Sequence, residues 1–599
     1  MKKVFKSVLI TVIYALLAYY FMLPAFNWQC KEFYMYVISI AVVYLVVAYL
    51  QRGQTSLVTE DNQDYQEEQS RGIFGRKSAK RMRTSTKIWA GIIVVAALIL
   101  VVGDVYSAEI FHAKTYQKLI TVEEREFSED ISQVSSSDVP VVDRDTAIRL
   151  GDRKLGELVD LVSQFEVDES DYSYTQISYN DVPTRVAPLI YGGIIKWLNN
   201  VSDGLPAYIS VDMTTQEVTL VRLDEGMKYS PGEYFFRDLD RYLRINYPTM
   251  IFDDYHFEVD DDGNPYWICP VIKYTIGVFG GKDIKGVVIV DACSGETQYY
   301  EIEDVPSWVD QAYSSDLVVQ QIDYWGEYSN GWLNTIFGQK DMFLSSGGSN
   351  YLALDDDVWL YTGLTSAGSD DSNIGFVLVN MRTKEAHYYE VSGATEESAM
   401  SSAEGQVQHL SYEATFPLLL NIGNLPTYFV SLKDDAGLVK MYAYVSVEQY
   451  QIVGTGDTLD EAYDAYIEAL NDDDTLEVEE EISVEDLVTV EGVVASLSTA
   501  VLDGNTNYYI ELEDSDNIYV ASIETSDILA VLQVGDTVTL GYEVADTTFI
   551  EVAEVVQAVT ADGTVIIDDR EDEEEEDEES AEEDSTDEDS SEETEEAEL

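Results

Sequence analysis

The chain has 599 residues, with 113 Asp and Glu against 35 Lys and Arg, which gives a formal net charge of −78. Hydrophobic residues make up 46% of the chain, enough to build folded cores, so a chain that is disordered throughout is excluded. Three Cys exclude a disulfide scaffold, and the shortage of Lys and Arg makes nucleic acid a poor partner. The charged residues are unevenly distributed along the chain. Residues 1–104 hold 12 Lys and Arg against 7 Asp and Glu, whereas the remainder hold 23 against 106.

Three apolar runs lie near the N-terminus. Residues 7–30 and residues 33–51 contain no charged residue, and only Lys31 and Glu32 separate these two runs. A third run covers residues 88–103. About 20 apolar residues cross a bilayer as a helix, so we predict three transmembrane helices within residues 1–106, with the lipid bilayer as partner. A buried core helix is the alternative for the third run.

Basic residues flank these runs unevenly. Three Lys precede the first run and eight Lys and Arg lie in residues 52–87, whereas the short loop between the first two runs has only Lys31. Positive residues favour the inner side, so this pattern predicts a plasma-membrane protein with a cytoplasmic N-terminus. Residues after about 106 are then extracytoplasmic. A cleaved signal peptide is not expected, because no small-residue cleavage site follows the first run and two more spans come after it.

The basic loop also contains a candidate contact with the inner leaflet. Its apolar residues stand among basic ones, a combination that suits an anionic lipid surface. The alternative is a solvated loop whose charges only set the topology. The candidate contact consists of Arg71, Ile73, Phe74, Arg76, Lys77, Lys80, Arg81 and Arg83.

A repeated pattern occupies the middle of the chain. Each copy has an apolar strand, a turn at Asp or Asn, a Thr/Ser-x-Glu step and a second alternating strand. The turn residues are Asp212, Asp291 and Asn380, separated by 79 and 89 residues, which is too long a period for a solenoid. Helical patterns precede the hairpins, as in residues 144–165 after the N-cap candidate Asp143. We therefore predict small α+β domains, each with a helix on an antiparallel sheet.

With Gly263-Asn-Pro-Tyr-Trp267 and the turn Asp291-Ala-Cys-Ser-Gly-Glu296, this pattern resembles the PepSY and cystatin-like domains of bacterial envelope proteins. The resemblance covers residues 140–310 and, more weakly, 311–455. It implies tandem PepSY-like repeats over 107–310 and a further α+β repeat region over 311–470. Such domains are extracytoplasmic modules that in some cases inhibit or chaperone proteases, so the resemblance implies protein binding. It supplies no catalytic residue.

The C-terminal part changes character after an acidic linker at residues 471–484. Residues 485–562 have five alternating strands, with a short helical candidate between the third and fourth, and resemble an OB-fold barrel. Many OB-folds bind oligonucleotides, but no Lys or Arg lies between Lys440 and Arg570, so we expect no nucleic acid here. Residues 563–599 are predicted to be a disordered acidic tail, because 22 of the last 32 residues are acidic.

No motif for catalysis is visible. The four His lie outside any His-Glu-x-x-His pair, and neither a Gly-x-Ser-x-Gly elbow nor a phosphate-binding Gly-x-x-x-x-Gly-Lys occurs. We therefore expect no enzyme and no cofactor. Weak calcium binding at Asp260–Asn264 or Asp355–Asp357 stays open, although neither segment has the ligand series of an EF-hand.

Two cysteines suggest a disulfide. If residues 266–278 and 286–293 form a hairpin about Gly280-Gly281, Cys269 and Cys293 face each other across the ladder, close enough to bond in an oxidising compartment. The alternative is a pair of buried thiols acting as small apolar residues.

The sequence as a whole predicts an integral membrane protein that presents a large acidic extracytoplasmic protein-binding module. The expected setting is envelope assembly, quality control or sensing, with other envelope proteins as partners. The alternative is an envelope hydrolase or transferase whose site is assembled in space. A subunit of a transport complex is disfavoured because the spans lack charge.

Overall fold

The computed structural model divides the chain into two compact units, residues 1–478 and 479–599. The boundary falls within the predicted linker. The candidate inner-leaflet residues 71–83, most of that linker and nearly all of the predicted tail lie outside the described residues. The structure describes residues 2–56, 84–134, 139–170, 172–180, 182–354, 356–366, 369–434, 436–471, 488–502, 505–512, 515, 517–522, 525–526, 528–542, 549–559 and 565–566.

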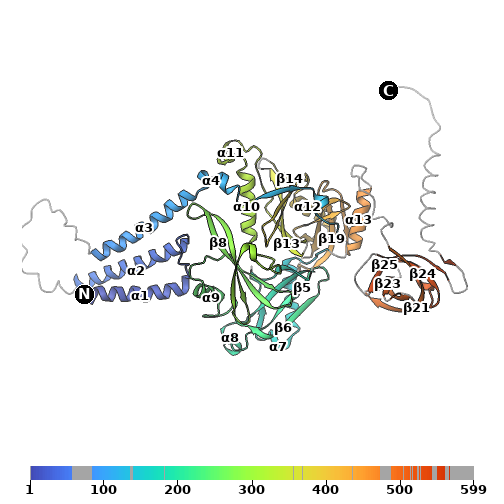
Figure 1. The fold of residues 1–599 in the computed structure, drawn as a ribbon, viewed down its shortest axis with the longest axis horizontal. Coiled ribbons are helices and arrows are strands. Elements are labelled where there is room, and N and C mark those ends of the chain that lie inside the picture. The colour runs from blue at the N-terminus through green and yellow to red at the C-terminus, as the bar shows by residue number, and fades with distance from the viewer. Residues whose placement is uncertain are drawn as a thin grey trace, which may run out of the picture. The chain divides into compact units, whose positions relative to one another are not determined.

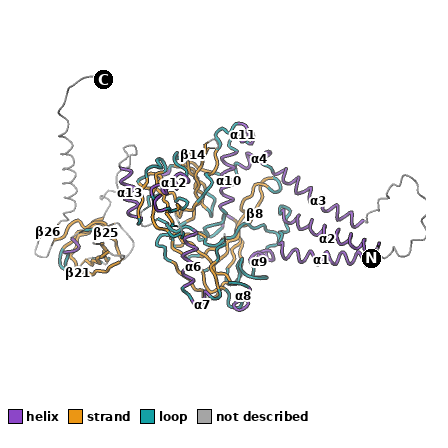
Figure 2. Tube along the Cα trace, turned by 180° about the vertical axis from the view of Figure 1, so that it is seen from behind, coloured by secondary structure: helices purple, strands orange, loops and turns teal. Residues whose placement is uncertain are grey.

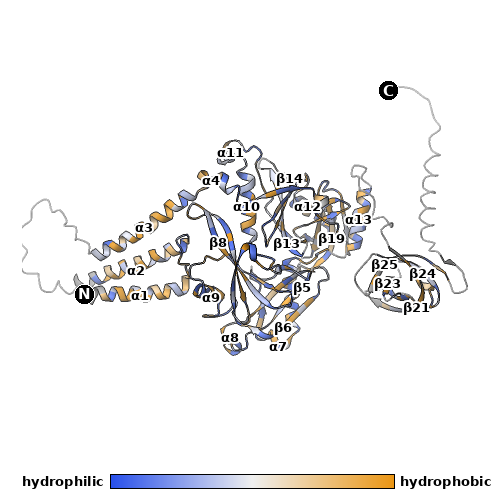
Figure 3. Cartoon of the chain, viewed as in Figure 1, coloured by the Kyte–Doolittle hydropathy of each residue, from blue (hydrophilic) through white to orange (hydrophobic). Residues whose placement is uncertain are grey.

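Three long helices form the N-terminal part: α1 (Lys2–Met22), α2 (Lys31–Ser56) and α3 (Thr84–Ser107). All three are long and apolar enough to cross a membrane, as Figure 3 shows by their mostly hydrophobic colouring. Helix α2 packs against both α1 and α3, for example through the stacked rings of Tyr44 and Trp89 with centroids 5.0 Å apart. Most side chains of α3 are exposed, so the third run is not a buried core helix. These features support a membrane protein.

The spans are joined firmly to the rest of the first unit. At the end of α3, the Ser107 hydroxyl accepts hydrogen bonds from the backbone N–H groups of Val278 and Phe279, at 2.8 and 3.0 Å. After α1, Phe26 donates a 2.7 Å backbone hydrogen bond to Pro248. Helix α3 leads directly into α4 (Glu109–Tyr116), followed by β1 (Val122–Arg125) and α5 (Phe127–Asp130).

Four copies of a helix followed by an antiparallel sheet make up most of the described residues from 141 to 471 (Figures 1 and 2). We call them repeat 1 (141–227), repeat 2 (228–301), repeat 3 (312–389) and repeat 4 (394–456). Helix α13 (Leu459–Asn471) follows repeat 4, and its Tyr466 is fully buried.

The first two repeats have sheet orders β2-β4-β5-β6, with β3 on β4, and β10-β9-β8-β7. Repeat 1 contains α6 (Arg144–Gly156), α7 (Val159–Val162), β2 (Phe165–Val167), β3 (Thr175–Tyr179), β4 (Val182–Tyr191), α8 (Ile194–Asn200), β5 (Leu205–Asp212) and β6 (Val218–Met227). Repeat 2 contains α9 (Leu239–Asn246), β7 (His256–Val259), β8 (Pro265–Ile276), β9 (Gly280–Asp291) and β10 (Thr297–Glu301), and the 3-10 helix η3 (Ile302–Asp304) follows it.

The last two repeats have sheet orders β15-β14-β13-β11, with β12 on β13, and β16-β18-β19-β20, with β17 on β18. Strand β1 extends the sheet of repeat 3 by pairing in parallel with β15. Repeat 3 contains α10 (Ser315–Glu327), α11 (Trp332–Phe337), β11 (Phe343–Ser345), β12 (Asn350–Leu354), β13 (Asp357–Ser366), β14 (Ser369–Asn380) and β15 (Ala386–Tyr389). Repeat 4 contains α12 (Glu396–Gln406), η4 (Gln408–Leu410), β16 (Glu413–Ala414), β17 (Leu418–Ile422), β18 (Leu425–Lys433), β19 (Val439–Ser446) and β20 (Val453–Gly456).

A shared turn organises repeats 1 to 3. Oδ1 of Asp212 accepts hydrogen bonds from the backbone N–H groups two and three residues further on, at 2.9 and 3.0 Å. Asp291 makes the same pair at 2.8 Å each, and Asn380 makes it at 2.9 Å each. Asp and Asn stabilise tight turns in this way because the side chain takes the place of a backbone acceptor. All three hairpins predicted at these residues are present.

The residue that follows the turn residue accepts backbone hydrogen bonds from the start of its own repeat. The carbonyl oxygen of Met213 accepts backbone hydrogen bonds from the two residues that open repeat 1, at 2.8 and 3.2 Å. Ala292 and Met381 do the same in repeats 2 and 3. In repeat 4 the carbonyl of Val447 accepts one such bond, at 2.7 Å, and the turn residue is Ser446. The structure therefore adds a fourth copy to the three found in the sequence.

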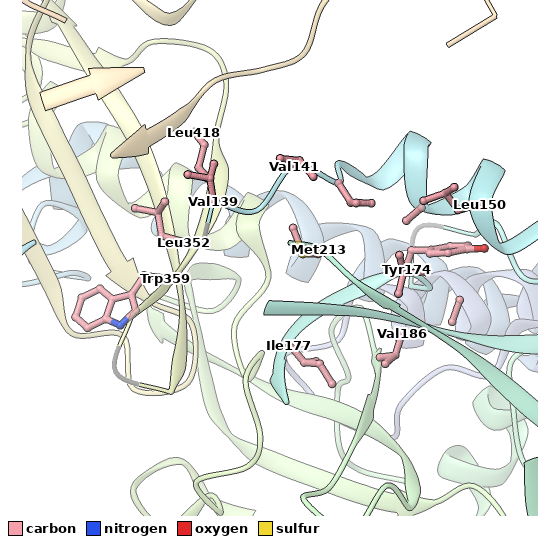
Figure 4. Packing of buried hydrophobic residues seen from close by; sticks show 14 of the residues in the cluster. Val139, Val141, Leu150, Tyr174, Ile177, Val186, Met213, Leu352, Trp359 and Leu418 are labelled. Carbon is pink, nitrogen blue, oxygen red and sulfur yellow. The ribbon is translucent and has the colours of Figure 1, made fainter. Parts of the chain in front are cut away.

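The repeats pack into common cores. One cluster of buried apolar side chains draws on all four repeats, and Figure 4 shows Tyr174 and Val186 of repeat 1 in the same cluster as Leu352 of repeat 3 and Leu418 of repeat 4. A second cluster joins repeats 2 and 3, including Ile268, Val318 and Leu360. Each fully buried side chain of this size contributes roughly 1.5–3 kcal/mol.

The second unit is a sheet of order β23-β22-β21-β24-β25-β26, in which β23 also pairs in parallel with β25. Its core includes Val494, Ile510 and Leu540. The elements are β21 (Val488–Leu502), β22 (Asn505–Leu512), β23 (Ile518–Ser522), α14 (Ile528–Val531), β24 (Thr537–Tyr542), β25 (Phe549–Val559) and β26 (Val565–Ile566).

Candidate functional site

A cavity of 980 Å³ lies where the end of α1 meets the first three repeats. Residues 21–23 of α1 form one side of it. The remaining lining comes from repeat 1 (Arg144, residues 170 and 172–176, and Arg185), repeat 2 (Asp240, Leu243, Arg244 and residues 252–256), Gln311 just before repeat 3, and repeat 3 itself (residues 314–316 and Tyr351). This volume is at the upper end of the range typical of ligand pockets.

Arg185 is the most buried charge in the lining. It stands on β4 and is 6% exposed. Its guanidinium donates to the carbonyl oxygens of Val142 and Tyr174 and to the amide oxygen of Gln176, at 3.4, 3.1 and 3.1 Å. Burial lowers the pKa of Arg185 to about 10, so it stays protonated at neutral pH. Because a guanidinium has five N–H donors, two remain for a ligand after these three bonds.

Two further arginines line the cavity and also bond to carbonyl oxygens. Arg144, at the start of α6, donates to Glu169 and Ser170 at 2.7 and 2.9 Å. Arg244, on α9, donates to the backbone of Leu23 at 2.9 Å. Within the described chain, none of the three arginines has a carboxylate oxygen within 4 Å. Their positive charges are therefore not neutralised by direct ion pairs, although acidic residues outnumber basic ones threefold.

The lining contains carboxylates as well. Asp253 pairs with Lys282 at 2.6 Å and accepts a hydrogen bond from the Ser314 hydroxyl at 3.2 Å. Asp240 accepts a hydrogen bond from the Tyr255 hydroxyl. The cavity thus presents fixed groups of both signs, which suits a ligand that itself carries both signs.

His256, the first residue of β7, adds an unpartnered polar atom. Its Nε2 is shielded from solvent and has no hydrogen-bond partner among the residues that the structure describes. Burial lowers the pKa of His256 to about 4, so the ring is neutral at physiological pH. A buried polar atom without a partner is costly, and a bound polar group would remove that cost.

Two buried acids, Glu258 and Asp310, lie next to Gln311 of the cavity lining. Glu258 accepts hydrogen bonds from the backbone N–H groups of Asp310 and Gln311, at 2.9 and 3.0 Å, and Gln311 lines the cavity. The carboxylate of Asp310 accepts a 2.9 Å hydrogen bond from the backbone of Ser178. Burial raises the pKa of Glu258 to about 7, and burial together with the charge of Glu258 raises that of Asp310. These bonds lock repeats 1 and 2 to the segment that opens repeat 3.

The predicted disulfide is wrong. Cys269 lies opposite Val288 in the ladder of β8 and β9, and Cys293 lies in the turn beyond β9. Both are free thiols. The hairpin turns at residues 277–279 rather than at Gly280-Gly281, and a register shift follows Val271, so the expected pairing does not occur.

Asp355, one of the residues considered for calcium, lies outside the described residues, whereas Asp260 and Asp357 make structural contacts. Oδ1 of Asp260 accepts backbone hydrogen bonds from Asp262 and Asn264, at 3.1 and 2.8 Å, and so closes a hairpin turn. Asp357 pairs with Arg382. Among the residues that the structure describes, no group of three or more His, Cys, Asp or Glu is arranged to hold a metal ion.

The cavity residues were not singled out in the sequence. The one available signal was Arg185, a cation within the otherwise uncharged run Val182–Tyr191 that becomes β4. Burying a charge is costly, so an arginine in such a run indicates either that the strand is not buried or that the arginine has a specific role.

No protein-family model matches the chain, and no curated protein matches it.

Proposed function

We propose that this chain is an integral membrane protein whose repeats form an acidic extracytoplasmic module that binds a segment of another envelope protein. The observation that carries the proposal is the cavity with three arginines that have no carboxylate partner among the residues that the structure describes. An extended peptide segment offers carboxylates or carbonyl oxygens to the arginines and N–H or ammonium groups to the aspartates. It also offers a partner for Nε2 of His256.

The setting is envelope assembly, quality control or sensing, and sensing draws support from the place of the cavity. Residues 21–23 at the end of α1 line it, and Arg244, which also lines it, donates a hydrogen bond to Leu23. A bound segment therefore touches the first span directly. The basic loop and the lysines before α1 favour a cytoplasmic N-terminus, which puts the repeats outside.

Two finer assignments belong to this proposal. The helix followed by a sequential antiparallel sheet supports a PepSY-like assignment for the repeats. The strand order of the second unit, with β23 paired to both β22 and β25, supports an OB-like arrangement. Its lack of Lys and Arg between residues 440 and 570 favours protein contact or a spacer role over nucleic-acid binding.

The test is site-specific photocrosslinking in living cells. A photoreactive residue is placed at Ser315, at the cavity, and at Leu438, an exposed residue of repeat 4 that does not line it. We expect a discrete crosslinked protein from position 315 only.

The cavity variant Arg144→Gln should reduce that crosslink severalfold. The matched control Arg153→Gln, an exposed residue of the same helix outside the cavity, should leave it unchanged. The same crosslinks from both probe positions, or equal crosslinks in the two arginine variants, would argue against binding in the cavity.

A further inference from the structure

Helix α8 and the neighbouring part of repeat 2 carry large apolar side chains in the open. Ile195 and Leu198 of α8 are 71% and 60% exposed, and Phe236 is 64% exposed. Phe235, next to Phe236 in the chain, and Ile245 of α9 are also exposed. A contiguous group of this kind on a soluble surface marks a contact with a partner or a membrane.

This group is continuous with the outer end of α1. The ring of Phe236 meets that of Tyr20 edge-on, with centroids 6.3 Å apart. The Arg241 guanidinium lies 4.7 Å from the centroid of the same Tyr20 ring. Trp197 of α8 packs on Phe235 at 5.7 Å. Ring contacts of the adjacent residues Phe236 and Phe235 thus reach α1 on one side and α8 on the other.

A second group surrounds the outer end of α3. Helix α4 follows α3 after one residue, and its Phe111 is 65% exposed. Helix α11 packs beside α4, with Leu333 and Phe337 exposed by 65% and 83%. A hollow of 590 Å³ lined by Phe111, Trp332 and Leu333 separates the two helices. Figures 1 and 2 show α4, α11 and α9 near the end of the repeat region from which the spans leave.

Basic residues accompany both groups, although the repeats are strongly acidic. Lys196 lies on α8, Lys114 on α4, and Lys340 three residues after α11. Apolar side chains with lysines beside them are typical of short helices that lie in the headgroup region of a membrane.

We propose that these two groups seat the repeats on the membrane that α1–α3 span. The side chains of α8, Phe235, Phe236 and Ile245 enter the lipid headgroup region on one side of the spans, and those of α4 and α11 enter it on the other. The occupant of both surfaces is lipid of the leaflet at which α1 and α3 emerge. Two separated contacts restrain the tilt of the repeats, so that the cavity at the end of α1 keeps a fixed height above the bilayer.

The test uses the full chain, purified and reconstituted into lipid vesicles with no other protein. Single cysteines for a polarity-sensitive fluorophore replace Ile195, Leu333 or Leu438 in a Cys293→Ser background, because Cys30 and Cys269 are buried. Leu438 is the control, exposed on the β18–β19 turn of repeat 4. We expect blue-shifted emission and severalfold stronger quenching by nitroxide headgroup lipids at positions 195 and 333 than at 438.

Water-like emission at 195 and 333 in these vesicles would assign the surfaces to a protein partner and overturn the proposal. Quenching at only one of the two positions would overturn the two-sided contact. Because Ile195→Cys and Leu333→Cys alter exposed side chains, misfolding is not expected, and circular dichroism of each labelled variant checks this.

Discussion

Oε2 of Glu258 accepts a 2.9 Å hydrogen bond from the backbone N–H of Asp310, and both acidic side chains are buried, with exposures of 0% and 2%. Burial raises the pKa of both carboxyl groups, that of Glu258 to about 7. Near neutral pH the native state therefore holds a proton that the unfolded chain has released. The stability of the junction between repeats 1, 2 and 3 therefore depends on the pH of the compartment.

The free energy of unfolding should fall as pH rises from about 5 to 8. Between the unfolded pKa of Glu, near 4.5, and the folded value of about 7, the native state binds more protons than the unfolded state, so stability decreases with pH. The size is on the order of 1–3 kcal/mol. Urea unfolding of the full chain in detergent, followed by tryptophan fluorescence across this pH range, measures it.

The variant Glu258→Gln separates this group from the general effect of a large negative charge. An amide nitrogen cannot accept a hydrogen bond, so one backbone N–H at Asp310 or Gln311 loses its partner, at a cost of about 1–3 kcal/mol. The slope of stability with pH should also become shallower. Glu303→Gln, at an exposed site, should change neither quantity. An unchanged slope in Glu258→Gln would contradict the role given to this carboxyl group.

The turn residues give a second prediction, because they differ in their surroundings. Asn380 is 3% exposed and donates a 2.9 Å hydrogen bond to Asp357, besides accepting the two turn bonds. Asn380→Asp introduces the residue found at Asp212 and Asp291 but replaces the donor by a second carboxylate. We expect a loss of about 1–3 kcal/mol in stability.

Asp291→Asn is the matched control for this variant. The amide oxygen keeps both turn bonds of Asp291, so its stability should change by less than about 0.5 kcal/mol. Both variants are compared by urea unfolding at pH 7. Equal stabilities would show that the contact between Asn380 and Asp357 contributes nothing.

These turns also show where sequence reasoning succeeds. The bonds of Asp212, Asp291 and Asn380 reach only two or three residues along the chain, so their signal is local and visible in the sequence. Repeat 4 lies within the α+β region predicted over 311–470, but its turn was missed because Ser446 replaces Asp or Asn, although its backbone follows the same pattern. The spans were likewise visible, since apolar length alone identifies them.

The cavity was not visible, for a physical reason. Its arginines come from positions 144, 185 and 244, and apart from the side chain of Gln176 their partners are backbone carbonyl oxygens, which almost any residue can supply. No pairing of side-chain types marks such contacts in a sequence. The disulfide prediction was wrong because it assumed a turn at Gly280-Gly281. The register of β8 and β9 depends instead on the three-residue turn 277–279.

Alkylation of the full chain gives a third prediction. Burial raises the pKa of Cys293 to about 11 and also raises that of Cys269 well above its usual value, and the thiolate is the reactive form. Iodoacetamide at pH 7.5 should modify Cys293 slowly and Cys269 only after unfolding. Mass spectra with and without reductant should show the same number of alkylated cysteines. A pair of cysteines that becomes reactive only after reduction would contradict the free thiols.

The last prediction concerns the joint between α3 and repeat 2. The Ser107 hydroxyl is buried, accepts the N–H groups of Val278 and Phe279, and donates a 2.7 Å hydrogen bond to the carbonyl of Gly103. Ser107→Ala removes the acceptor of both N–H groups, and for the buried N–H of Phe279 this costs about 1–3 kcal/mol. The turn at 277–279 should then open more often.

Hydrogen–deuterium exchange of the reconstituted full chain measures this opening, and peptides covering residues 277–281 should exchange at least several times faster in Ser107→Ala. The matched control is Ser39→Ala on α2, whose hydroxyl bonds only the carbonyl of Tyr36 in its own helix. That variant should leave exchange at 277–281 unchanged, because the bond it loses makes no contact with the repeats. If both variants accelerated exchange equally, the effect would come from the spans in general, and Ser107 would not be the joint between α3 and repeat 2.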